Sequence, residues 1–312
     1  MYEQKEKNYI SLVIYLHEDE NIVEKNLLGI DQVFSKYFSD FEIILVNDAS
    51  QDTTIEKVKT IQNQFHAPIT ILNLSYYHGL EMAMVSGQKI AIGDYIYEFD
   101  TLNIDYDLEQ LVEIYRISLT GFDIVALTPD VKPSFFNRIF YRLLEVSSLR
   151  KMKLYTETAR IISRRAVNRV GILNNNVNYR KASYHYSGLP TKHLFYKPNH
   201  KISYNQLSFS TKFNLGYEIM IRYSHIASTI SIGLSMLFFV FSLLMIGFVV
   251  GSYIIVQNIA SGWTTSMMFL TISFSGLFLV LSMILKYLDM LLRDKTISKT
   301  YVYDSIEQLK NK

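Results

Sequence analysis

The chain of 312 residues contains no cysteine. It therefore cannot form a disulfide framework or a zinc site with cysteine ligands. The N-terminal stretch "MYEQKEKNY" is charged and has no apolar core, so no secretory signal peptide is predicted there. Charged side chains are also absent from one long segment: no Lys, Arg, Asp or Glu occurs from Tyr223 to Leu285.

This uncharged run is long enough for two membrane-spanning helices, since one span needs about 20 apolar residues. We place the spans at about 227–256 and 265–287, joined by a polar loop without positive charge. A buried helical hairpin of a soluble protein is the alternative interpretation. Residues 212–226 carry apolar side chains at helical spacing and predict an interfacial amphipathic helix. Cations flank the hairpin on both sides, at Lys212, Arg222, Lys286, Arg293 and Lys295, and the positive-inside rule then predicts two cytoplasmic termini.

The net charge of +2 conceals a strong asymmetry. Residues 1–131 hold 8 basic and 22 acidic side chains, a net charge of −14, whereas residues 132–226 hold 17 and 3, a net charge of +14. A block this basic usually faces nucleic acid, lipid headgroups or a phosphate ligand, and a solvated basic surface is the alternative. The block contains no RNA-binding motif, so we predict a membrane partner and no nucleic acid.

The first 130 residues alternate between strand and helix patterns. Apolar runs rich in β-branched residues predict buried strands, and apolar residues at helical spacing predict helices between them. This alternation is typical of a parallel α/β sheet. The expected strands cover residues 9–16, 41–48, 69–74 and 94–100, and the expected helices cover residues 21–37, 53–65 and 78–92.

Two acids, Asp48 and Asp100, stand where predicted strands end. Ligands of parallel α/β sheets bind at the carboxyl ends of the strands. Each acid alone could be a turn or helix-capping residue. Because both are expected at the same edge of one sheet, the pattern favours a binding site.

Several segments resemble one enzyme family. "SLVIYLHEDENI" is similar to its first strand and acidic loop, "EIILVNDASQDTT" to its "VDDGSxDGT" signature, and "ARIISRRAV" to its "FRLLSRRAV" segment. The apolar hairpin followed by "ILKYLDMLLRD" is similar to its C-terminal end. On these segments the chain resembles the family 2 glycosyltransferases, which have an α/β, Rossmann-like GT-A fold. More narrowly, it resembles the polyprenyl-phosphate glycosyltransferases similar to dolichol-phosphate mannose synthase.

The resemblance implies roles for particular residues. Nucleotide-sugar binding is assigned to Glu18, Asp48, Ser50, Asp52 and Asp100, and catalysis to Asp100 and Glu157. Asp100 and Asp105 would hold Mg²⁺ or Mn²⁺, hard cations that prefer oxygen ligands. Arg160 and Arg180 would bind the phosphate of the acceptor lipid, because a guanidinium group matches phosphate geometry.

The sequence departs from the family pattern where the chemistry is expected. The second acid of the family's "DxD" motif is Leu102, which cannot bind a metal ion. The acid that precedes the arginine of "FRLLSRR" by two residues is Thr158, although Glu157 is adjacent. Asp105 or Asn103 could supply a replacement oxygen, since Mg²⁺ needs only one or two carboxylates.

We therefore expect an inverting, membrane-bound glycosyltransferase. It would transfer a sugar from a nucleotide-sugar to a polyprenyl phosphate on the cytoplasmic leaflet, for synthesis of cell-envelope glycans. The alternative is a catalytically impaired relative that serves as a scaffold or partner of an active enzyme, and a homo-oligomer is left open. A polymerising synthase is disfavoured, because two spans do not readily form an export channel. The expected parts are a cytoplasmic GT-A domain (1–211), the interfacial helix (212–226), the hairpin (227–290) and a cytoplasmic tail (291–312).

Overall fold

The computed structural model describes residues 5–131, 155–173, 180–199 and 303–309, together with single helical positions between 266 and 291. The chain divides into two compact units. One unit comprises Met1–Tyr141, Met152–Thr211 and Lys299–Lys312, and the other comprises Arg142–Lys151 and Lys212–Ser298.

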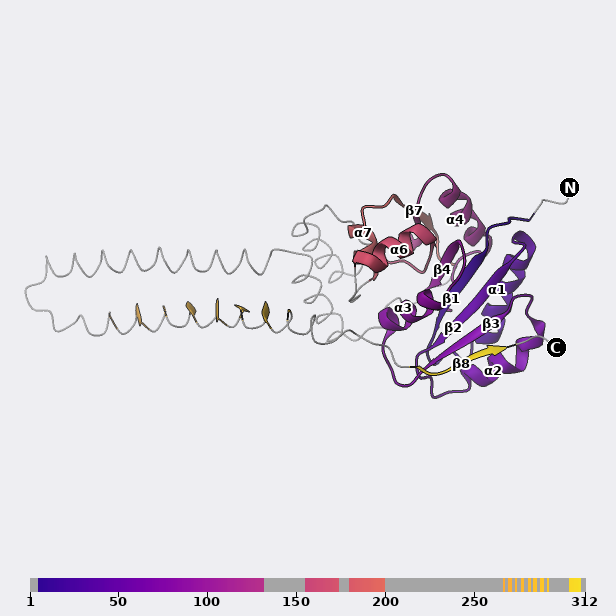
Figure 1. Cartoon of the computed structure of the whole chain (residues 1–312), viewed down its shortest axis with the longest axis horizontal. Coiled ribbons are helices and arrows are strands. Elements are labelled where there is room, and N and C mark those ends of the chain that lie inside the picture. Colours follow the sequence, from indigo (N-terminus) through magenta and orange to yellow (C-terminus); the bar gives the residue numbers. More distant parts are fainter. Residues whose placement is uncertain are drawn as a thin grey trace, which may run out of the picture. The chain divides into compact units, whose positions relative to one another are not determined.

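The described strands of the first unit form one sheet (Figure 1). Its strand order is β7-β5-β6-β4-β1-β2-β3-β8. The strands are β1 (Ile10–Leu16), β2 (Phe41–Asn47), β3 (Ile69–Leu74), β4 (Tyr95–Phe99), β5 (Ile124–Pro129), β6 (Ala159–Ser163), β7 (Thr191–Tyr196) and β8 (Tyr303–Leu309). β1 to β4 are parallel, as predicted, whereas β6 and β8 run antiparallel to their neighbours.

Helices connect the strands and cover both faces of the sheet. They are α1 (Val23–Tyr37), α2 (Thr54–Ile61), the short 3₁₀ helix η1 (Gln62–Gln64), α3 (Leu80–Ile90), α4 (Glu109–Leu119), α6 (Arg164–Leu173) and α7 (Arg180–Tyr186). Each of the four strands and three helices expected in the first 100 residues is confirmed, with small differences at its ends.

Alternate residues of the strands supply two separate hydrophobic cores, because successive side chains of a strand point to opposite faces. Leu12 and Ile14 of β1 pack with the apolar sides of α1, α2 and α4. Val13, between them, packs on the other face with α3. The contact with α3 is close: a Cβ atom added at Gly87 would lie 2.5 Å from Cγ1 of Val13 and 2.6 Å from Cγ2 of Val46.

The C-terminal strand β8 belongs to the same sheet as the N-terminal strands. It pairs antiparallel with β3, and the Asn73 side chain donates a hydrogen bond to Oγ of Ser305 at 3.0 Å. Nζ of Lys59 lies 2.6 Å from a carboxylate oxygen of Glu307. The sequence predicts only a tail here, so this strand is an addition to the expected fold.

The predicted interfacial helix (212–226) and first span (227–256) lie outside the described residues, as does most of the second span (265–287). The single positions described between residues 266 and 291 are helical. Within the described part of the chain, no helix has the length and apolar character that a membrane crossing requires.

Candidate functional site

The carboxyl ends of β1, β2 and β4 lie at one edge of the sheet, because β1 pairs in parallel with both of the other strands. Asp48 directly follows β2, and Asp100 directly follows β4. The structure therefore brings the two acids that the sequence singled out to the same edge, where α/β sheets bind their ligands.

The loops that follow β1 and β2 are tied together by hydrogen bonds. The Glu18 carboxylate accepts from the backbone N–H of Gln51 at 2.7 Å, and the backbone N–H of Glu18 donates to Oγ of Ser50 at 3.4 Å. The Asp52 carboxylate accepts from the backbone N–H of Glu20 at 3.0 Å. Three of the predicted nucleotide-sugar residues, Glu18, Ser50 and Asp52, thus lie together in two interlocked loops.

Asp48 is fully buried, and the chain itself occupies its carboxylate. Oδ1 accepts from the backbone N–H of His78 at 2.7 Å. Oδ2 accepts from the backbone N–H of Gly79 at 2.8 Å and from the hydroxyl of Tyr15 at 3.0 Å. The loop before α3 therefore caps this acid, and a nucleotide reaches the Asp48 carboxylate only if that loop moves away.

Asp100, Arg160 and Arg180 form a buried ion-pair cluster. Nη2 of Arg160 lies 2.7 Å from Oδ2 of Asp100, and Nη2 of Arg180 lies 2.7 Å from Oδ1. Both arginine residues are 1% exposed. Arg160 comes from β6, which pairs with β4, and Arg180 begins α7. The predicted catalytic acid and the two predicted lipid-phosphate ligands thus bind one another.

Glu98 is a member of this cluster that the sequence reasoning missed. Its carboxylate lies 2.9 Å from Nη1 of Arg160 and 2.7 Å from Nη1 of Arg180, and it is fully buried. It also accepts hydrogen bonds from the Tyr184 hydroxyl at 2.9 Å and from the Gln88 amide. The signal was an acid within the apolar strand "YIYEF", since a buried carboxylate needs cationic or hydrogen-bonding partners.

Two further carboxylates pair with the outer nitrogens of the arginines. Oε2 of Glu157 lies 3.1 Å from Nε of Arg160, and Oε2 of Glu81 lies 2.9 Å from Nε of Arg180. Glu157, the other predicted catalytic residue, is therefore linked to the strand-end acid through Arg160. All three nitrogens of each guanidinium group face a carboxylate.

Lys181 is the outermost described cation of the cluster, with its side chain 13% exposed. Its Nζ atom lies 3.6 Å from Oδ2 of Asp100 and donates to the backbone carbonyl of Glu157 at 3.5 Å. Lys181 also lines a hollow of about 20 Å³ together with Tyr184 and His193. Because these two contacts of the ammonium group are long, Lys181 keeps donor capacity for an incoming anion.

The charges of the cluster fix the protonation state of its central acid. Burial alone would raise the pKa of Asp100, but the nearby charges of Arg160, Arg180 and Lys181 outweigh burial and hold that pKa below its usual value. Asp100 is therefore ionised throughout the neutral range. Burial lowers the pKa of His193, so this imidazole is neutral near pH 7.

The oxygen atoms near Asp100 do not fit a site for Mg²⁺ or Mn²⁺. Both carboxylate oxygens of Asp100 face guanidinium groups. Leu102 is fully buried in the hydrophobic core, and the Asp105 carboxylate accepts from the Tyr196 hydroxyl at 2.7 Å. Among the described residues, no three His, Cys, Asp or Glu side chains gather in a metal-binding arrangement.

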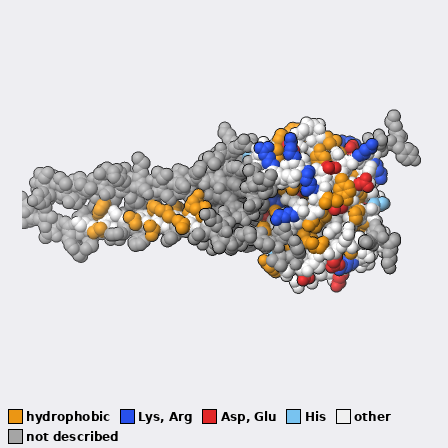
Figure 2. All heavy atoms as spheres, in the orientation of Figure 1, with side chains coloured by type: hydrophobic (Ala, Val, Ile, Leu, Met, Phe, Trp, Pro, Cys, Tyr) orange, Lys and Arg blue, Asp and Glu red, His pale blue; other side chains and the backbone are white. Residues whose placement is uncertain are grey.

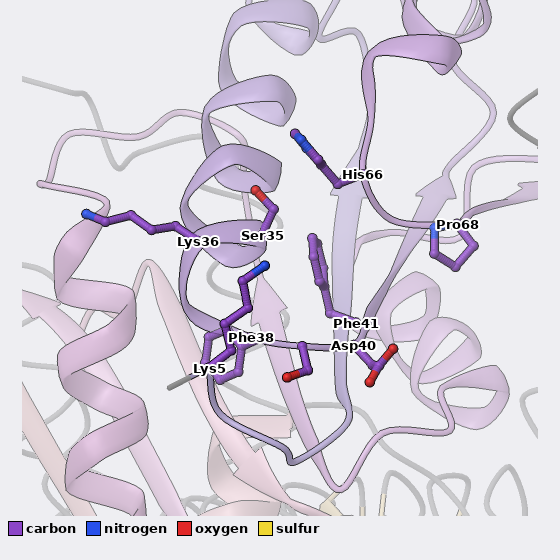
Figure 3. A pocket seen from close by; sticks show the side chains of 9 residues that line it. Lys5, Ser35, Lys36, Phe38, Asp40, Phe41, His66 and Pro68 are labelled. Carbon is purple, nitrogen blue, oxygen red and sulfur yellow. The ribbon is translucent and has the colours of Figure 1, made fainter. Parts of the chain in front are cut away.

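A separate cavity of about 370 Å³ lies at the opposite end of β2 (Figure 3). Its lining includes Lys36, Phe41 and His66, which lie around the start of that strand. None of the predicted site residues lines this cavity. The candidate site is therefore the ion-paired edge of the sheet and not this hollow.

Cations also lie on the exposed surface of α6. The space-filling view shows Lys and Arg side chains toward the side of the domain that α6 and α7 occupy in Figure 1 (Figure 2). Arg165 of α6 has a side chain that is 71% exposed and pairs with Asp123. Arg169 of the same helix is also exposed. These side chains, unlike Arg160 and Arg180, are open to an anionic surface.

A family comparison decides the class of this protein. Residues 11–227, more than half of the chain, match the family model for Glycosyl transferase family 2. The chain belongs to glycosyl transferase family 2. It is thus a transferase enzyme, and the family expected from its sequence segments is confirmed.

Individual relatives are distant. CsbB of Bacillus subtilis (strain 168), which bears a glycosyltransferase name, is 23% identical over 224 residues, which make up 69% of this chain and 67% of CsbB. The undecaprenyl-phosphate 4-deoxy-4-formamido-L-arabinose transferase of Pseudomonas fluorescens (strain Pf0-1) is 22% identical over 116 residues. That match covers 37% of this chain and only 34% of the Pseudomonas enzyme.

A solved structure supports the fold. Glucosyl-3-phosphoglycerate synthase from Mycobacterium tuberculosis, crystallised with Mn²⁺, UDP-glucose and phosphoglyceric acid, superposes with a TM-score of 0.50 and 12% sequence identity. The superposition covers 69% of this chain and 78% of the synthase. The α/β GT-A fold that the resemblance implied is therefore confirmed.

Proposed function

We propose that this family 2 glycosyltransferase transfers a sugar from a nucleotide-sugar to a polyprenyl phosphate on the cytoplasmic leaflet of a membrane. The observation that carries the proposal is the gathering of Glu18, Asp48 and Asp100 at the carboxyl edge of the sheet. The partial match to an enzyme named for undecaprenyl phosphate supports a lipid acceptor. An envelope glycan is the product class that this acceptor suggests.

Apolar side chains of the second unit support a membrane location. The described helical positions between 266 and 291 include several large apolar side chains that are 43–58% exposed, which is costly in water. They are Leu270, Leu277, Leu281, Ile284, Tyr287, Leu288 and Leu291. Lipid contact would remove that cost.

The pairing of β8 with β3 supports a hairpin. Both strands belong to one sheet, so the chain before residue 199 and the chain after residue 303 lie in the same domain. Any membrane crossing between these two residues must therefore be matched by a second crossing. This agrees with two spans and with termini on the same side of the membrane.

Thiol labelling tests this topology, because the native chain has no cysteine. Cysteines are introduced singly at Ser261, in the predicted outer loop, and at Lys312. On intact cells, an impermeant reagent is expected to label the Ser261→Cys variant, and to label the Lys312→Cys variant only after permeabilisation. The reverse pattern would refute the proposed orientation.

The chemistry needs little acid–base assistance from the chain. An oxygen of the lipid phosphate, already ionised at neutral pH, forms a bond to the anomeric carbon of the sugar. The bond from that carbon to the donor diphosphate breaks, and the nucleoside diphosphate leaves with the electron pair. A strong general base is unnecessary, so Thr158 in place of an acid is compatible with turnover.

The roles predicted for Arg160 and Arg180 depend on movement. Each guanidinium group is buried and faces three carboxylate contacts, so a lipid phosphate reaches either group only if the cluster opens. The exposed Arg165 and Arg169 of α6 are better placed for lipid headgroups. Mg²⁺ or Mn²⁺ is the implied cofactor, but no step is assigned to it because the donor set does not fit.

A scaffold without turnover is the second candidate function. One observation favours it: the carboxylates of both Asp48 and Asp100 are already occupied by donors of the chain. A substrate would have to displace those donors.

A transfer assay separates the two functions. Full-length protein in detergent is given undecaprenyl or dolichyl phosphate and labelled UDP-glucose, UDP-N-acetylglucosamine or GDP-mannose, with Mn²⁺ or with excess EDTA. Labelled lipid that forms with the native protein and is lost in a folded Asp48→Asn variant supports the enzyme. No labelled lipid with any donor and acceptor, from folded protein, supports the scaffold.

A further inference from the structure

The ion-paired edge of the sheet holds its own positive charges where the resembling enzymes use a metal ion. Asp100 and Glu98 are two residues apart in sequence and both face the guanidinium groups of Arg160 and Arg180. Lys181 approaches Asp100 from the outside. With Glu157 and Glu81, which pair with the Nε atoms of the arginines, the cluster holds three cations and four carboxylates, a formal net charge of −1.

The three cations are not equivalent. Every nitrogen of both guanidinium groups lies within 3.1 Å of a carboxylate oxygen, although Nε of Arg160 and Nη1 of Arg180 make no hydrogen bond and are fully buried. The Lys181 ammonium, in contrast, has three donors and only contacts of 3.5 and 3.6 Å within the described cluster. An ammonium group with unused donors is the part of the cluster best able to bind phosphate oxygens.

We propose that Lys181, supported by Arg160 and Arg180, takes the place of the divalent cation and binds the diphosphate of the donor without metal. The inference rests on the proposed transfer from a nucleotide-sugar. When the bond between the anomeric carbon and the diphosphate oxygen breaks, negative charge grows on the leaving group. A fixed cation beside that oxygen stabilises this charge, as a metal ion does in other enzymes. The arginines are positioning residues, because they hold Asp100 and keep Lys181 at the edge of the site.

Calorimetric titration of the full-length protein with UDP, GDP and inorganic diphosphate tests the inference. The native protein is expected to bind at least one of these probes equally well in excess EDTA and in Mn²⁺. Lys181→Met should weaken that binding about tenfold or more, because a charge-assisted hydrogen bond is lost. Lys181→Arg should restore most of it. Lys192→Met is the matched control, since Lys192 is an exposed lysine of β7 and should leave binding unchanged.

Thermal unfolding of each variant first shows that it is folded. Binding that requires Mn²⁺, no binding of any probe in EDTA, or a Lys181→Met variant equal to the native protein would each overturn the inference. The transfer assay gives a separate answer. Lipid transfer that occurs only with Mn²⁺ upholds the proposed function and overturns the metal-free site. Metal-free binding lost in Lys181→Met, with no transfer to any lipid, upholds the site and overturns the proposed function.

Discussion

Replacing Arg160 by methionine removes the charge at the centre of the buried cluster while keeping a long side chain. The guanidinium group contacts carboxylates of Glu98, Asp100 and Glu157 at 2.9, 2.7 and 3.1 Å. After the substitution, Arg180 and Lys181 would be the described cations left beside Glu98 and Asp100. The expected result is a large loss of stability, because buried negative charge is left without enough compensation.

The size of this loss follows from burial. Removing one partner of a buried ion pair costs about 3–5 kcal/mol. Arg160 is 1% exposed and serves three carboxylates, so we expect the upper part of that range, about 4–5 kcal/mol. A typical domain is stable by only about 5–15 kcal/mol, so the Arg160→Met variant should lie close to unfolding.

Urea unfolding of the full-length protein in detergent, followed by pulse proteolysis, measures the effect. The midpoint should fall by at least about 1.3 M, given ordinary urea dependences of about 1–3 kcal/mol per M. Arg165→Met is the matched control, because the Arg165 side chain is 71% exposed and its ion pair with Asp123 is screened by water. Adding Glu98→Gln to Arg160→Met should recover part of the loss. Equal midpoints for Arg160→Met and Arg165→Met would show that the cluster does not stabilise the domain.

Three further outcomes are expected from urea midpoints. Leu102→Asp should lower the free energy of unfolding by about 3–5 kcal/mol, because it puts a charge into the hydrophobic core, and Mn²⁺ should not restore it. A urea midpoint of this variant that rises with Mn²⁺ would contradict this. Gly87→Ala should destabilise the domain, because overpacking against Val13 costs about 1–3 kcal/mol, whereas the higher helix propensity of alanine contributes at most about 1 kcal/mol. An unchanged urea midpoint would contradict this expectation. Because the pKa of Asp100 is lowered in the folded state, its ionisation stabilises the protein fully above about pH 4, and this stabilisation falls as the pH drops toward the folded-state pKa. The urea midpoint of the native protein should therefore decline below about pH 4 more steeply than the midpoint of Asp100→Asn.

The first hundred residues were predictable because their signals are local. Buried parallel strands read as continuous apolar runs, and the helices between them carry regular apolar spacing. β8 was not predictable in this way. Its sequence, "YDSIEQL", mixes polar and apolar residues, and its partner β3 lies more than 200 residues earlier in the chain. Only the folded sheet shows that this edge strand pairs with β3.

The site was predictable in its positions and not in its partners. Asp48 and Asp100 could be predicted as candidate site residues because they follow β2 and β4, and strand ends can be located from the apolar pattern. That Arg160 and Arg180 bind Asp100 could not be read from the sequence, because one arginine lies 60 residues and the other 80 residues farther along the chain. The acid Glu98 within an apolar strand indicated that buried cations were needed, and the positions of those cations follow only from the packing of β6 and α7.

The leucine in the altered "DxD" motif and the two buried arginines can be understood together. An edge with two inward-facing carboxylates, Glu98 and Asp100, needs two positive charges to be stable in a dry environment. A divalent cation supplies both charges at once, and two guanidinium groups supply one each. The two solutions exclude one another, because guanidinium groups that occupy both oxygens of Asp100 leave none for a metal ion. Leu102 then costs the site little, since a second acid would have added negative charge to a cluster whose carboxylates already outnumber its cations. The loss of the motif is therefore no argument against turnover, provided that a cation of the chain can reach the donor diphosphate, and Lys181 is the residue placed to do so.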